Sequence, residues 1–151
     1  MSEAVSYDEL DPPVRELVRV LNEEFAGVET IGSCGGHEDG TPGGMHASSD
    51  EWWVTFHLEP ADSDAAVAAP SERAWLDLEF LVYWIGQLAR ERKVDVDLLP
   101  WAPPPHLNEP GRMLRFELRG RRGDGGIEPD EVAAWIRDGL EELYVEGGEL
   151  P

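Results

Sequence analysis

Lysine is almost absent from this 151-residue chain, because eleven of its twelve basic side chains are arginine and only Lys93 is lysine. Acidic side chains number 32, so the formal net charge is −20 at pH 7. Such a surface repels nucleic acid and anionic membranes over a Debye length of about 8 Å at physiological salt. We therefore expect no non-specific binding to nucleic acid.

Cysteine and long apolar runs are also scarce. The single Cys34 excludes an internal disulfide, and the first ten residues lack the basic and apolar regions of a signal peptide. The longest strictly apolar run, Phe80 to Ile85, is far shorter than the ~18–20 residues that a membrane helix requires. The sequence predicts a cytoplasmic protein without a membrane partner.

The remaining composition favours a folded protein. Apolar residues make up 41% of the chain, and six of them are tryptophan, so there is enough apolar material for a core. The length fits one domain covering residues 1–151. The surplus negative charge strains the compact state by self-repulsion, which salt relieves. The composition resembles that of halophilic proteins, and a salt-rich cytoplasm is our hypothesis for it.

The apolar pattern predicts seven elements in the order α-β-β-α-β-β-α. Three helices are expected at about 11–27, 71–92 and from Pro129 onward, and four strands at 28–31, 52–58, 94–98 and 113–118. Helices packed on an antiparallel or mixed sheet make a two-layer α+β sandwich.

The long helix at 71–92 is apolar around most of its circumference, which is typical of a helix buried on several sides or lying at a subunit interface. One prediction is therefore a non-catalytic homodimeric interaction domain. In that interpretation Tyr83 and Trp84 lie at the interface.

The polar residues that could carry chemistry gather on a glycine-rich stretch that we predict to be a turn. Gly32, Gly35 and Gly36 allow a close backbone approach to a ligand. The candidate ligand-binding residues are Thr30, Ser33, Cys34, Gly35, Gly36 and His37, with His57 on the following strand. The plainer alternative is a chain reversal in which Cys34 is a small buried apolar residue.

Three kinds of site fit this stretch. The C-x-x-H spacing of Cys34 and His37 permits a zinc site completed by His46, His57 or neighbouring carboxylates. Cys34 could instead be a nucleophile with His37 or His57 as its base, although nearby acids disfavour a thiolate. The glycine-rich backbone could also cradle an anion, and a local basic groove could form from the arginines between Arg112 and Arg122.

The same stretch resembles a known family. The segment T-I-G-S-C-G-G-H at 30–37, followed by W-V-T-F-H-L-E at 53–59, is similar to a turn and strand of the tRNA wybutosine-synthesising methyltransferases. The matching positions are Thr30, Ser33, Cys34, Gly36 and the strand residue His57, whereas His37 stands where that family has arginine. The resemblance covers about a fifth of the chain and implies an α+β fold with a pocket for S-adenosylmethionine and a modified tRNA base.

Two function classes remain open at this point. Similarity to small uncharacterised proteins with an S-C-x-G-H turn implies a fold and a pocket but no reaction. The charge argues against a tRNA substrate, since such enzymes offer a basic face. The alternatives are therefore a small-molecule or metal-binding protein centred on Cys34, His37 and His57, catalytic or not, and the homodimeric interaction domain.

Overall fold

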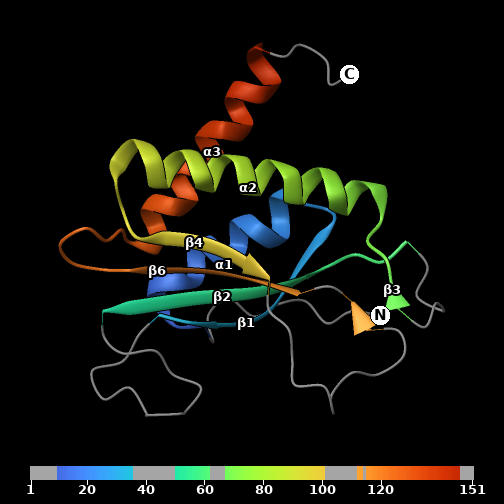
Figure 1. Cartoon of the computed structure of the whole chain (residues 1–151), viewed down its shortest axis with the longest axis horizontal. Coiled ribbons are helices and arrows are strands. Elements are labelled where there is room, and N and C mark those ends of the chain that lie inside the picture. The colour runs from blue at the N-terminus through green and yellow to red at the C-terminus, as the bar shows by residue number, and fades with distance from the viewer. Residues whose placement is uncertain (1–9, 36–49, 62–66, 101–111, 114, 147–151) are drawn as a thin grey trace.

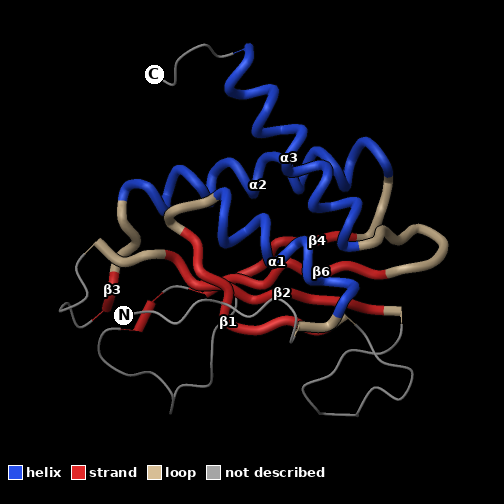
Figure 2. The backbone as a smooth tube through the Cα atoms, turned by 180° about the vertical axis from the view of Figure 1, so that it is seen from behind, coloured by secondary structure: helices blue, strands red, loops and turns tan. Residues whose placement is uncertain are grey.

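The computed structural model describes residues 10–35, 50–61, 67–100, 112–113 and 115–146. Its helices are α1 (Pro12–Glu24), α2 (Glu72–Arg92) and α3 (Pro129–Glu146). The main sheet has the order β1-β2-β6-β4, from β1 (Val28–Cys34), β2 (Glu51–Leu58), β6 (Arg115–Arg121) and β4 (Val96–Pro100), and each pairing is antiparallel. The three helices cover one face of this sheet (Figures 1 and 2), which confirms the predicted α+β sandwich.

One small addition to the predicted order lies outside the main sheet. The two-residue strands β3 (Val67–Ala68) and β5 (Arg112–Met113) pair in parallel. The predicted connection between β2 and α2 thus contains a short strand, and an isolated bridge between Pro60 and Pro70 closes its base.

Local chemistry explains where the long helix begins and ends. The Ser71 hydroxyl accepts a hydrogen bond from the Ala74 backbone N–H at 3.1 Å, which satisfies a donor that the first turn leaves unpaired. The helix ends at Arg92, and the next residue, Lys93, has a φ of 52°, which is the left-handed conformation that terminates helices. These boundaries confirm the helix predicted at 71–92.

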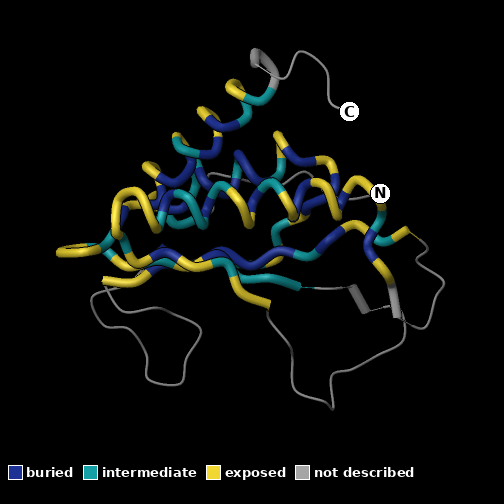
Figure 3. Tube along the Cα trace, turned by 45° about the horizontal axis from the view of Figure 1, so that its top comes forward, coloured by how far each residue is buried: buried dark blue, intermediate teal, exposed yellow. Residues whose placement is uncertain are grey.

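The core lies between the sheet and the helices. Alternate residues of β2 point to the helices and are buried, namely Trp52, Val54, Phe56 and Leu58. They meet the inner faces of α1, α2 and α3 in one cluster of buried residues. Figure 3 colours the buried positions along the sheet and the helices. The Trp52 indole N–H donates to the Ile127 carbonyl at 2.8 Å, so the largest buried side chain is also hydrogen-bonded.

The glycine-rich stretch differs from the prediction. Gly32, Ser33 and Cys34 belong to β1, where they pair with residues 53–55 of β2 after a register shift between Thr30 and Gly32. The predicted turn at these three residues is therefore wrong. Strand β6 likewise continues to Arg121, beyond the predicted end at residue 118.

Candidate functional site

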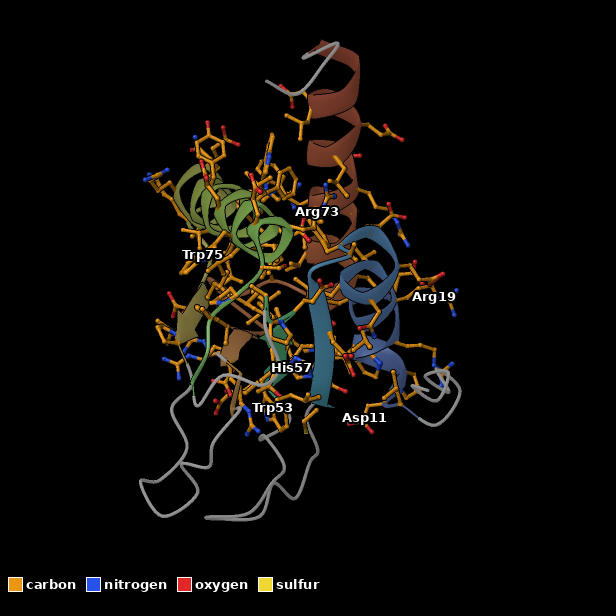
Figure 4. All side chains as sticks on the ribbon, turned by 90° about the vertical axis from the view of Figure 1, so that its right-hand side faces the viewer. Asp11, Arg19, Trp53, His57, Arg73 and Trp75 are labelled. Carbon is orange, nitrogen blue, oxygen red and sulfur yellow. The ribbon has the colours of Figure 1, made fainter. Side chains whose placement is uncertain are left out.

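The face of the main sheet opposite the helices carries Cys34 and His57, two of the five predicted site residues that the structure describes, whereas Ser33 pairs with Val54 on the helix side. Directly paired residues of an antiparallel sheet share a face. We call this surface the helix-free face, and its members are Glu29, Gly32, Cys34, Glu51, Trp53, Thr55, His57, Asp97, Leu99, Arg115, Glu117, Arg119 and Arg121. Figure 4 labels Trp53 and His57 on β2.

Thr30 and Gly35 make contacts within the fold. Asn22 of α1 donates from Nδ2 to Thr30 Oγ1 at 2.8 Å and accepts the Thr30 backbone N–H at 3.0 Å. The Gly35 backbone N–H donates to Asp11 Oδ2 at 2.9 Å, and Arg122 donates to the Gly35 carbonyl. These hydrogen bonds fix the two ends of the candidate segment against α1 and the end of β6, so both residues have structural roles.

Cys34 and His57 share the helix-free face but lie apart along it. Cys34 pairs with Trp53 and His57 with Glu29, so four residues of β2 separate their positions. At about 3.4 Å per residue this is roughly 14 Å, which is too far for shared ligation or direct proton transfer. Gly36, His37 and His46 lie outside the described residues, and the described residues contain no group of three or more potential metal ligands.

His57 is a largely buried titratable group that lies beside a carboxylate. Its side chain is 12% exposed, Nε2 lies 3.8 Å from the Glu29 carboxylate, and Nδ1 is buried with no hydrogen-bond partner among the described residues. Burial lowers the pKa of His57 below its usual value, the Glu29 carboxylate opposes this shift, and Arg115 adds to it. The imidazole is therefore held in its neutral form at neutral pH.

We expect a stability change on acidification that depends on His57. Because the pKa of His57 is lowered in the folded protein, the unfolded chain binds the proton more tightly. The stability that is present above about pH 6.5 is therefore lost as the pH falls through the pKa of the folded protein. Urea unfolding between about pH 7 and pH 5 measures this loss. His57→Gln should reduce the slope of unfolding free energy against pH. An unchanged slope would show that His57 is not the group responsible.

The arginines of β6 do not form the basic groove that the sequence suggested. Arg119 lies 3.9 Å from Glu117 and Arg121 lies 3.6 Å from Asp95. A half-open hollow of about 370 Å³ on this side of the sheet contains both arginines but four carboxylates, and it is lined by Glu51, Trp52, Trp53, Asp95, Asp97, Glu117, Arg119, Gly120 and Arg121. The local charge is therefore negative and does not favour an anionic ligand.

A second surface that could carry a function is the outer face of α2. The inner face is buried through Ala74, Leu78, Leu81, Ile85 and Leu88. Four large apolar side chains on the other side are each more than half exposed, and we call them the α2 outer patch: Trp75, Leu76, Val82 and Tyr83. Figure 4 shows Trp75 on the side of α2 away from α1.

The patch includes one of the two aromatic residues predicted for an interface. Tyr83 is exposed, whereas the Trp84 ring packs against Phe80 and Trp135, and the Trp84 carbonyl accepts the Trp135 indole N–H at 2.8 Å. The sequence does not distinguish these two neighbours, since the apolar pattern of α2 is nearly continuous. One sequence feature does point to the α2 outer patch: an apolar pair recurs after seven residues, at 75–76 and 82–83.

No helix in the described part of the chain is long and apolar enough to cross a membrane. Comparison with known proteins finds no matching family model, no similar curated protein and no similar solved structure.

Proposed function

We propose that this protein is a non-catalytic interaction domain that forms a homodimer through the α2 outer patch. The observation that carries this proposal is the concentration of exposed apolar surface. Of the six large apolar side chains exposed in the described residues, four lie on this one helix face. Contiguous exposed apolar surface on a soluble protein marks an interaction site, whereas single exposed apolar residues need no explanation.

Gly86 supports the same surface independently. It lies inside α2, where glycine costs about 1 kcal/mol relative to alanine. Each of the other eight glycines in the described residues either has a positive φ or would bring an added Cβ within 3.2 Å of a neighbouring atom, but at Gly86 only the Arg90 guanidinium approaches, at 4.0 Å. Nothing within the described fold requires glycine there, and a second helix packed closely against α2 would.

The α2 face also has a consistent helical geometry. At 100° per residue, Trp75, Leu76, Val82, Tyr83 and Gly86 fall within an arc of about 120°. A face of this width is what one packed helix covers. A partner helix packed on this face would bury the outer side of α2, whose inner side already packs on the core.

Sedimentation equilibrium of the purified chain tests the proposal. We expect reversible association in the wild type and in Ile31→Ser, which removes an exposed apolar residue of β1, and loss of association in Leu76→Ser/Val82→Ser. Because each copy carries a charge of −20, association should strengthen when salt screens the mutual repulsion. A chain that stays monomeric in molar salt, or a double variant that associates as the wild type does, would overturn the proposal.

A second candidate is a small-molecule or metal site on the helix-free face that includes Cys34 or His57. The buried Nδ1 of His57, which lacks a hydrogen-bond partner among the described residues, supports it. Native mass spectrometry should then detect a bound metal or small molecule that Cys34→Ser or His57→Ala removes. Spectra of the wild type that contain only the bare chain would count against this site.

A further inference from the structure

We infer that two copies of α2 pack antiparallel, with Tyr83 of each copy against Gly86 of the other and Glu79 facing the partner copy's arginine at position 90. This inference rests on the proposed function and specifies which residues determine the pairing. Glu79, Gly86 and Arg90 lie on the same face as the α2 outer patch, near its centre line at 100° per residue.

Charge is distributed unevenly along this face of α2. Glu72 and Glu79 lie in its N-terminal half, whereas Arg90 lies near its C-terminal end and is followed by Lys93. Neither Glu79 nor Arg90 forms a salt bridge with another described residue. A face that is acidic at one end and basic at the other complements its own copy when the two helices run in opposite directions.

The two-fold symmetry of a dimer fixes the register of the two helices once one pair of facing residues is chosen. In a two-fold antiparallel pair, the numbers of facing residues have a constant sum. Facing Glu79 with Arg90 of the other copy fixes that sum at 169, which also brings Tyr83 opposite Gly86 twice. The missing side chain at Gly86 then leaves room for the Tyr83 ring, and Leu76 faces the aliphatic stem of Lys93.

Two other arrangements of the same two helices place like charges together. An antiparallel pair centred on the α2 outer patch itself, midway between residues 75–76 and 82–83, would put Glu79 beside its own copy on the two-fold axis. A parallel pair would do the same for Glu72, Glu79 and Arg90. Like charges that face each other in an interface disfavour an arrangement, so the register with the sum of 169 is preferred over these two.

Charge exchange at the two facing positions tests the register by sedimentation equilibrium. We expect Glu79→Arg alone and Arg90→Glu alone each to weaken association about tenfold, because every dimer contains the contact twice. The double variant Glu79→Arg/Arg90→Glu should restore the dissociation constant to within about threefold of the wild type. Glu91→Arg is the matched control for Glu79→Arg. It makes the same change in net charge at an exposed position about 120° around the helix from Glu79.

The size of residue 86 gives a second test. Gly86→Leu should weaken association at least tenfold while leaving the monomer folded, since only the Arg90 side chain comes near the position of the added Cβ. Circular dichroism verifies the fold of this variant. Patch-dependent association in which the charge exchange gives no rescue would overturn the antiparallel register and leave the proposed function standing. If Leu76→Ser/Val82→Ser left the association unchanged, the proposed function would instead be overturned.

Discussion

Replacing Trp52 by alanine is expected to lower the free energy of unfolding by about 3–5 kcal/mol. The side chain is 1% exposed and lies directly over Gly120 of β6, where an added Cβ would come within 2.3 Å of the ring. Truncation would therefore leave a cavity between β2 and β6 and remove the hydrogen bond to the Ile127 carbonyl. Guanidinium unfolding followed by far-ultraviolet circular dichroism measures the change without relying on tryptophan fluorescence.

The neighbouring tryptophan provides the control for this prediction. Trp53 lies on the helix-free face and is only partly buried. Trp53→Ala should therefore lower the free energy of unfolding much less than Trp52→Ala does. Equal costs for the two substitutions would mean that the core does not lie on the helix side of β2.

The second large effect is expected at Asp77, a buried carboxylate on the inner side of α2. Its Oδ2 accepts the Gly27 backbone N–H at 2.8 Å, and Oδ1 lies 3.3 Å from Arg73 Nε. Asp77→Leu removes the acceptor and leaves a buried N–H without a partner, which costs about 1–3 kcal/mol. Asp77→Asn keeps an acceptor of the same shape and should retain most of the stability, and urea unfolding at neutral pH compares the two.

The pH dependence at Asp77 has the opposite direction from that at His57. Burial raises the pKa of Asp77, and the Gly27 N–H and Arg73 oppose this shift. The folded chain therefore holds the proton to a higher pH than the unfolded chain does, so the associated stability is fully present below the unfolded pKa of about 3.8 and is lost as the pH rises through the folded value. Asp77→Asn should remove this loss. If Asn and Leu were equally destabilising, the hydrogen bond to Gly27 would not be what Asp77 contributes.

Local sequence signals were sufficient for the helices but not for the glycine-rich strand. Ser71 before a long apolar segment and Pro129 at a helix start are short-range features, and both helices begin where these residues predict. Gly32 to Cys34 look like a turn in isolation, because three glycines occur within five positions. They form a strand because β2 pairs with them, and a partner 19 to 23 residues away cannot be read from local composition.

The candidate site shows the same limit more strongly. The sequence identified Cys34 and His57 as polar residues near a strand, but their separation depends on the register between β1 and β2, which includes a shift after Thr30. The outer face of α2 was undecided for another reason. An almost continuously apolar helix does not reveal which side meets the core, and here Leu78, Leu81 and Ile85 take that side while Val82 and Tyr83 do not.

The strand order has a consequence for how the chain folds as it is synthesised. Strand β2 lies between β1 and β6, yet β6 ends 63 residues after β2 in the sequence. At about 5–20 residues per second, a ribosome needs roughly 3–13 s to make that intervening segment. During this interval one edge of β2, with Trp52, Val54 and Phe56 on its apolar face, has no partner strand. We therefore expect this edge of β2 to be a site of aggregation in the nascent chain until β6 has been made.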